Sequence, residues 1–169
     1  METVLRSLVY DDIRYMKEFF EDSDISSQFK FTKKPYSEKT LRDFVDNSNG
    51  DVDIHMAIEY DGEYAGTISL KNCDFVNKKC EYAIVLRKKF WSKGISKDAS
   101  NKIIDYAFDV LEFNKVYLNV MSSNVRAMKF YKKIGFQFEG TFKKHLLIDN
   151  EFIDIDWYAI FNKKMEGQK

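Results

Sequence analysis

The segment 90–96 reads Phe-Trp-Ser-Lys-Gly-Ile-Ser, and it joins an apolar, strand-like run at 82–86 to an amphipathic run at 95–111. A strand, a tight turn with one glycine and then a helix predict an anion site, because the first N–H groups of a helix lack partners within it and carry partial positive charge. A pyrophosphate fits such a site. An ordinary strand-to-helix turn has the same pattern, so the segment alone leaves both interpretations open.

The composition is that of an ordinary globular chain, and its length of 169 residues predicts one compact domain over 1–169. The 27 basic and 27 acidic residues balance, which argues against a nucleic-acid partner because such binders carry a basic excess. We see no apolar run long enough for a membrane span and no signal-peptide core in the first residues. We therefore expect a cytoplasmic protein with no membrane partner.

The cysteines and histidines predict free thiols and no metal site. Cys73 and Cys80 flank a predicted turn, and without an export signal we expect both to stay reduced. His55 and His145 are far apart in the sequence and give no metal-ligand spacing.

Hydrophobic periodicity predicts a mixture of strands and helices. Antiparallel hairpins early in the chain and a strand–helix–strand unit in its middle indicate an α+β domain around one mixed sheet. The predicted strands cover 5–9, 55–60, 64–70, 80–86, 115–120, a strand that starts at 136, 141–148 and 152–161. The predicted helices run from residue 11 or 12 through 20, from 37 through 45, over 95–111 and from 124 through 134.

Two motifs resemble the signatures of the GNAT N-acetyltransferase superfamily. The first signature, Gln/Arg-x-x-Gly-x-Gly/Ala, corresponds to residues 91–96, where Gly94 matches strictly while Trp91 and Ser96 replace its first and last members. This looser form is similar to the ribosomal-protein and diamine acetyltransferase branch. The second, more specific motif reads Asn124-x-x-Ala127-x-x-x-Tyr131-x-Lys133-x-Gly135-Phe136, followed by Glu139-Gly140.

With both motifs in order and at the family's spacing, the chain is identified as a member over essentially its whole length. The resemblance implies an α+β fold whose mixed, mostly antiparallel central sheet is flanked by helices. It also implies that the fourth and fifth strands splay apart, and that acetyl-CoA binds as the cosubstrate where they part. No metal is implied.

The resemblance implies a set of cofactor contacts as well. The pyrophosphate would lie on the backbone amides of the turn, and the pantetheine arm would run beside the fourth strand. A helix-capping asparagine would hydrogen-bond to the arm, a role compatible with its cap. The tryptophan of the turn would shield the cofactor or simply pack. The residues concerned are Val85, Leu86, Trp91, Ser92, Lys93, Gly94, Ile95, Ser96 and Asn124.

Tyr131 stands where the family places its general acid. The departing thiolate needs a proton, and a phenol with a pKa of about 10 can supply it to a thiol with a pKa of about 8.5 if the site assists the transfer. The alternative is a partly buried aromatic side chain on a helix.

The general base is less defined by the sequence. Glu81 lies on the fourth predicted strand, where many family members place a carboxylate, and it could take the proton of the attacking amine directly or through water. Its alternative role is an ion pair with Lys79 at the edge of the strand. His145 and Asp156 are further candidates for the base.

The acceptor is expected to be a small primary amine, with a polyamine favoured by the similarity to the diamine branch. The segments 23–50 and 145–156 should build its site. Lys30, Lys33 and Lys34 oppose this choice, because three lysines repel a polyamine and attract a phosphate or carboxylate. They could also form a solvated loop with no specific role.

The sequence is compatible with other functions. A nucleotide-linked amino sugar or a protein N-terminal amine could be the acceptor, and a homodimer is possible. A non-catalytic acyl-CoA-binding sensor would keep Gly94 and Asn124 but would not need Tyr131, so Tyr131 favours an enzyme. A pure protein-interaction domain would not need the anion turn.

Overall fold

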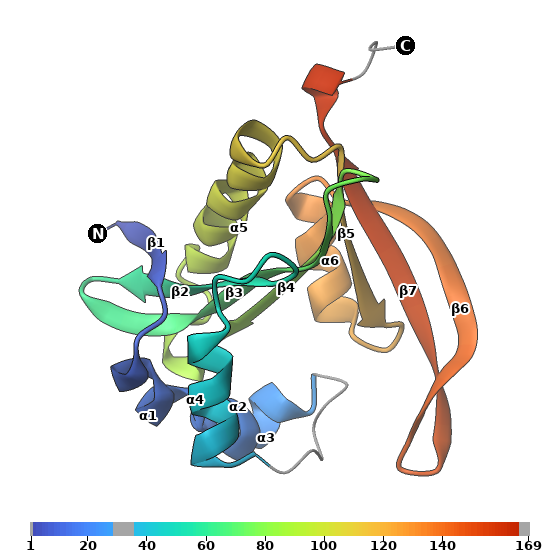
Figure 1. The fold of residues 1–169 in the computed structure, drawn as a ribbon. Helices are drawn as coiled ribbons and strands as arrows, with labels where there is room; N and C mark the ends of the chain where they lie inside the picture. The colour runs from blue at the N-terminus through green and yellow to red at the C-terminus, as the bar shows by residue number, and fades with distance from the viewer. Residues whose placement is uncertain (1, 29–35, 166–169) are drawn as a thin grey trace.

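A computed structural model of the chain describes residues 2–28 and 36–165 (Figure 1). Within these residues, seven strands form one sheet in the order β1-β2-β3-β4-β5-β7-β6. Neighbouring strands run antiparallel, except for β4 and β5, which run parallel. The strands are β1 (Thr3–Ser7), β2 (Ile54–Tyr60), β3 (Glu63–Asp74), β4 (Lys79–Leu86), β5 (Lys115–Met121), β6 (Gln137–Ile148) and β7 (Glu151–Phe161).

Helices flank this sheet, which confirms the predicted α+β fold with its mixed, mostly antiparallel sheet. The lysine-rich loop of the sequence analysis (Lys30, Lys33 and Lys34) lies outside the described residues. The helical segments are η1 (Tyr10–Asp12), α1 (Ile13–Met16), α2 (Glu18–Glu21), α3 (Ser23–Ser26), α4 (Glu38–Asp46), η2 (Lys88–Phe90), α5 (Ile95–Asp105), η3 (Tyr106–Val110), α6 (Val125–Lys133) and η4 (Lys163–Met165).

Some predicted boundaries need correction. The predicted first helix is divided into η1, α1 and α2, although Lys17 between α1 and α2 keeps helical angles (φ −57°, ψ −34°). After α2, Asp22 is extended (φ −81°, ψ 115°), and its side chain accepts a hydrogen bond from the Asp24 N–H at the start of α3. The predicted helix over 95–111 ends in a π-helical turn at η3. The first strand lies two residues earlier than predicted, because its pairing with β2 begins at Thr3. The ends of a strand are set by the strand it pairs with, and a local apolar pattern carries no information about that partner.

The start of α4 follows its local sequence. The Ser37 side chain accepts a hydrogen bond from the Thr40 N–H at 3.1 Å, and the Thr40 side chain accepts one from the Ser37 N–H at 2.9 Å. This reciprocal cap satisfies N–H groups that have no partner inside the helix.

Each face of the sheet buries its own hydrophobic cluster. Successive strand residues point to opposite faces, so Tyr82 packs on the side of α5 and α6 while Glu81 points to the side of α1–α4. The cluster under α5 and α6 includes Ile68, Ile103 and Val116, each with 0% exposure. Burial of one such side chain contributes about 1.5–3 kcal/mol, so both clusters fix the sheet firmly between its helices.

The sheet opens between β4 and β5. The two strands pair only at Lys79, Cys80 and Glu81, opposite residues 115–117. Beyond this point β4 stays with β3 as far as Leu86, and β5 stays with β7. The predicted splay of the fourth and fifth strands is thereby confirmed, and it leaves a gap, called here the β4–β5 gap.

Candidate active site

A cavity of about 510 Å³ occupies the β4–β5 gap and the turn that leads into α5. Its wall is built by β4 and β5, by α5 and α6 on one face of the sheet, and by Ile25 of α3 on the other. The sequence-predicted site residues that line it are Glu81, Val85, Leu86, Trp91, Ser92, Gly94, Ser96, Asn124 and Tyr131.

The side chains of Lys93 and Ile95 are not in the wall of this cavity. Ile95 is 1% exposed and belongs to the core under α5, and the Lys93 ammonium lies 5.4 Å from the centre of the Phe90 ring. These two residues can therefore contribute only their peptide groups to the turn.

The turn has the backbone geometry of an anion site. Gly94 is the N-cap of α5 with φ 80°, and Ser92 also has a positive φ of 63°. The Gly94 carbonyl accepts hydrogen bonds from the N–H groups of Lys97 and Asp98. The N–H groups of Ile95 and Ser96 come before Lys97 in the chain. Because the first N–H groups of a helix have no acceptor within it, these two are available to an anion.

Trp91 has a structural role besides lining the cavity. Its indole N–H donates a hydrogen bond to the Leu86 carbonyl at 3.1 Å. The guanidinium of Arg126 lies over its ring, 4.2 Å from the ring centre. Trp91 thus connects the end of β4 to the first turn of α6.

The register of β4 decides which peptide groups face the gap. The Arg87 N–H donates to the Ala65 carbonyl of β3, and peptide groups alternate in direction along a strand. Leu86 and Ile84 therefore turn their peptide groups toward the β4–β5 gap. Val85 turns its peptide groups toward β3 and contributes its side chain to the cavity.

Tyr131 is enclosed by aromatic rings. Its ring makes edge contacts with Tyr82 and Phe136, each with 6.1 Å between ring centres. Burial raises the pKa of Tyr131 to about 12, because the charged phenolate loses hydration. The phenol therefore keeps its proton at neutral pH.

Glu81 lies where β4 and β5 begin to part, and it accepts three hydrogen bonds. Lys71 and Asn119 donate to one carboxylate oxygen at 3.1 Å each, and Asn72 donates to the other at 2.9 Å. The predicted ion pair with Lys79 is wrong. Lys71 is the partner, because the register places it directly opposite Glu81 on β3.

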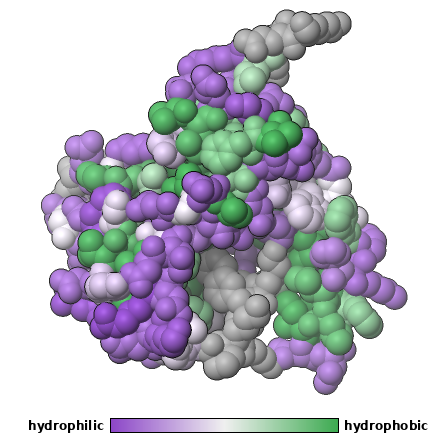
Figure 2. Space-filling model, viewed as in Figure 1, coloured by the Kyte–Doolittle hydropathy of each residue, from purple (hydrophilic) through white to green (hydrophobic). Residues whose placement is uncertain are grey.

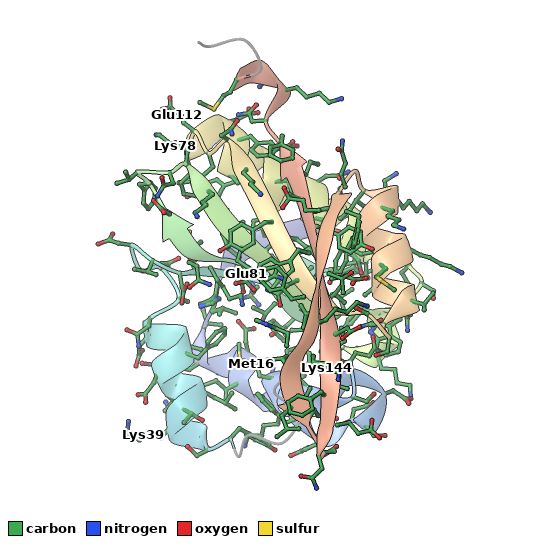
Figure 3. The ribbon with its side chains drawn as sticks, turned by 90° about the vertical axis from the view of Figure 1, so that its right-hand side faces the viewer. Met16, Lys39, Lys78, Glu81, Glu112 and Lys144 are labelled. Atoms are coloured by element: carbon green, nitrogen blue, oxygen red, sulfur yellow. The ribbon has the colours of Figure 1, made fainter. Side chains whose placement is uncertain are left out.

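The two candidate catalytic side chains approach the cavity from opposite faces of the sheet. Tyr131 packs with Tyr82 on the α5–α6 side, whereas Glu81 lies on the side of α1–α4, between α4 and the β6–β7 hairpin (Figure 3). Because the sheet is open here, both side chains line one cavity.

The other candidate residues have local roles. The Asn124 side chain accepts a hydrogen bond from the Ala127 N–H at 3.1 Å and caps α6. The Asp156 side chain accepts hydrogen bonds from the hydroxyls of Ser122 and Thr141. His145 is exposed beside Phe142. Neither His145 nor Asp156 lines the cavity, so the geometry favours Glu81 as the base.

A family model described as an acetyltransferase (GNAT) domain matches residues 5–157 of the chain. The chain belongs to the GNAT family. It is an acetyl-CoA-dependent acyltransferase. Among the described residues, no group of three or more histidine, cysteine, aspartate or glutamate side chains is placed to hold a metal ion. No helix in the described part of the chain is long and apolar enough to cross a membrane.

Curated relatives and solved structures agree with this membership. The YdaF protein of Bacillus subtilis (strain 168), named as a ribosomal N-acetyltransferase, is 35% identical over 116 residues, which are 69% of this chain and 63% of that protein. Spermidine N(1)-acetyltransferase of Escherichia coli (strain K12) is 30% identical over 159 residues, 93% of this chain and 84% of that protein. The crystal structure of spermidine N-acetyltransferase from Vibrio cholerae in complex with CoA and spermine has a similar fold, with a TM-score of 0.85, 23% identity and 98% of both chains covered.

Sequence reasoning missed several residues of this GNAT cavity. Asn119, Lys97 and Arg126 all line it, and Lys133 was named only as part of a motif. The helical spacing of α6 contains a signal for two of them, because Arg126 and Lys133 are seven residues apart and share a face. For Asn119 we find no such signal, since its position depends on strand pairing.

Proposed function

We propose that this GNAT protein acetylates a primary amine of a small, polyamine-like molecule, by direct attack of the amine on the thioester of acetyl-CoA. The observation that carries the proposal is the cavity in the β4–β5 gap, with Tyr131 on one face of the sheet and Glu81 on the other. The Escherichia coli relative named for spermidine, similar over 93% of this chain, supports a polyamine as the acceptor.

The residues of the cavity suit acetyl-CoA. The amides at the start of α5, with the left-handed Gly94 before them, would receive the pyrophosphate. The edge of β4 would pair with the pantetheine arm through the peptide groups of Ile84 and the N–H of Leu86, since the Leu86 carbonyl already accepts from the Trp91 indole. Because the Asn124 oxygen caps α6, its amide nitrogen remains as a donor for that arm.

The reaction needs two proton transfers. The amine nitrogen attacks the carbonyl carbon of the thioester, the carbon–sulfur bond breaks, and the acetyl group remains on nitrogen. Glu81, through a water molecule, takes the proton that the nitrogen loses, and Tyr131 gives its proton to the thiolate sulfur. Glu81 then releases its proton to solvent, and Tyr131 takes one up from solvent.

Tyr131 is a suitable acid because the burial around it acts on both partners of the proton transfer. A phenol with a pKa of about 12 is a weaker acid than a thiol with a pKa of about 8.5 in water. The burial that disfavours the phenolate also disfavours the thiolate, because both are anions without hydration in the gap. The proton transfer is therefore closer to balance than the values in water suggest.

Glu81 can act as the base while it keeps its three donors. An ionised carboxylate offers roughly four acceptor positions, and Lys71, Asn72 and Asn119 use three of them. The remaining position suits a water or the amine. In Glu81→Gln the rise of turnover with pH is expected to move to higher pH, and an unchanged profile would remove Glu81 from this role.

The direct test is acetyl-CoA turnover against a panel of amines, followed through release of free thiol and the mass of the product. Spermidine and spermine represent the proposal, while a nucleotide-linked amino sugar and a peptide with a free N-terminus represent the alternatives. Turnover of an alternative but not of polyamines would overturn the choice of acceptor. CoA binding without turnover of any amine would favour the acyl-CoA sensor.

We also propose that two copies of the chain associate through the β6–β7 hairpin. β6 is an edge strand, and Figure 2 shows hydrophobic side chains gathered over this hairpin. Phe138, Phe142, Leu147 and Phe152 are between 50% and 64% exposed. Exposed apolar edges of this kind invite pairing. Sedimentation of the parent and of Phe142→Glu tests the idea, and a parent that stays monomeric at all concentrations would contradict it.

A further inference from the structure

Three basic side chains line the cavity in addition to Lys71. Lys97 lies in the first turn of α5, and Arg126 and Lys133 lie near the two ends of α6. Within residues 2–28 and 36–165, none of the three has a carboxylate at ion-pair distance. Lys71 is by contrast paired with Glu81.

Arg126 and Lys133 share one face of α6, and both line the cavity. They are seven residues apart, which is about two turns or roughly 10 Å along a helix, and Phe130 between them also lines the cavity. Positive charge is therefore distributed along one wall of the cavity rather than collected at one point.

Arg126 is held in place by an aromatic contact. Its guanidinium lies over the Trp91 ring at 4.2 Å from the ring centre, and the Trp91 indole is itself hydrogen-bonded to the Leu86 carbonyl. Stacking uses the face of the guanidinium and leaves the N–H donors at its edge available. A planar fork of donors suits a phosphate group.

One helix terminus cannot balance the charge of CoA. The amides at the start of α5 amount to about half an elementary charge, and they are assigned to the pyrophosphate. CoA carries a further phosphate monoester on its ribose, with a charge of about −1.5 to −2 at pH 7. Lys97 in the first turn of α5 and Arg126 over the Trp91 ring lie beside the turn, and Lys133 adds a third charge of the required sign to the same cavity.

We propose that Lys97, Arg126 and Lys133 form a second anion subsite that binds the ribose 3′-phosphate of CoA and so selects CoA over dephospho-CoA. The inference rests on the acetyl-CoA chemistry of the proposed function and deepens it. The backbone turn binds the pyrophosphate common to both molecules, and the side-chain subsite recognises the phosphate that only CoA has.

The test compares binding of CoA and dephospho-CoA by calorimetry at low and high salt. The parent protein is expected to prefer CoA by about tenfold or more at low salt, and to lose part of that preference as salt screens the charges. The variant Lys97→Met/Arg126→Gln/Lys133→Met should bind both molecules alike, with its affinity for dephospho-CoA within a few-fold of the parent's.

A matched control separates local contacts from net charge. Lys129→Met/Lys132→Met/Lys163→Met removes the same number of charges from exposed positions outside the cavity, and it should keep the preference for CoA. Equal binding of CoA and dephospho-CoA by the parent would overturn the subsite, as would an equal loss of preference in the control. If the parent binds neither molecule, the proposed function fails first, and the two failures are thereby distinguished.

Discussion

At the scale of a single residue, Tyr131→Phe removes the phenolic donor and keeps the ring that packs against Tyr82 and Phe136. Turnover is expected to fall by about 10²–10⁴-fold, the usual effect of one acid–base group. CoA affinity should change little, because the packing is preserved. Steady-state kinetics and calorimetry on the same preparations measure both quantities. Turnover at the parental rate would show that another group protonates the thiolate.

Gly94 can be tested against a second glycine with nearly the same backbone conformation. Gly94 has φ 80° and Gly62 has φ 75°, and an added Cβ meets nothing within 4 Å at either position. Alanine should therefore cost about 1–2 kcal/mol of folding stability at both sites, because a left-handed conformation disfavours any Cβ.

Only Gly94→Ala is expected to weaken CoA binding, since Gly62 lies in the β2–β3 turn and not in the cavity wall. Denaturant unfolding measures the shared cost, and calorimetry with CoA measures the difference. If the two variants bind CoA equally well, the α5 turn does not hold the pyrophosphate.

At the scale of an element, Asn124 combines the cap of α6 with a proposed contact to the pantetheine arm. Asn124→Asp keeps an oxygen that accepts from the Ala127 N–H, but it has no amide nitrogen to donate. We expect this variant to keep the stability of the parent and to bind CoA more weakly. Asn124→Ala should lose both CoA affinity and about 1 kcal/mol of stability, because the cap is also removed.

Thermal unfolding and CoA titration of the two Asn124 variants separate these roles. Parental CoA affinity in Asn124→Asp would leave the residue with the cap alone. The loss of the cap should be measurable because α6 has only nine residues, and a short helix depends strongly on the hydrogen bonds at its ends.

At the scale of the whole molecule, buried tyrosines should make the fold sensitive to alkali. Burial raises the pKa of Tyr131 to about 12 and raises the pKa values of Tyr64 and Tyr82 as well. Above pH 10 the unfolded chain releases these protons while the folded chain keeps them, so stability is complete below pH 10 and falls as pH rises toward 12.

Urea unfolding between pH 8 and pH 11 measures this dependence. The free energy of unfolding should decrease with pH above about 10, and the slope should be smaller in Tyr131→Phe than in the parent. A parent whose stability is constant up to pH 11 would contradict the burial of these tyrosines. A Tyr131→Phe variant with the parental slope would contradict the burial of Tyr131.

The local features of the chain were predictable from its sequence. The strand, the turn at Gly94 and the helix that follows depend on neighbouring residues, and so does the Ser37–Thr40 cap of α4. The spacing from Asn124 to Tyr131 likewise fixes which residues share a face of α6. Such patterns can be recognised without knowing which element packs against the segment, because backbone preference and helical periodicity are properties of a short segment.

Contacts between distant segments were decided by the tertiary structure alone. The carboxylate of Glu81 meets Lys71 and not Lys79, because opposite residues on paired strands lie about 5 Å apart whereas positions i and i+2 on one strand lie about 6.6 Å apart. Register also turned the peptide groups of Ile84 toward the gap, and the position of α6 set the Arg126 guanidinium over the Trp91 ring. The sequence alone therefore determined most elements and the motif that we propose to bind the cofactor. Strand register and helix packing decided which side chains meet there, since both depend on residues far apart in the chain.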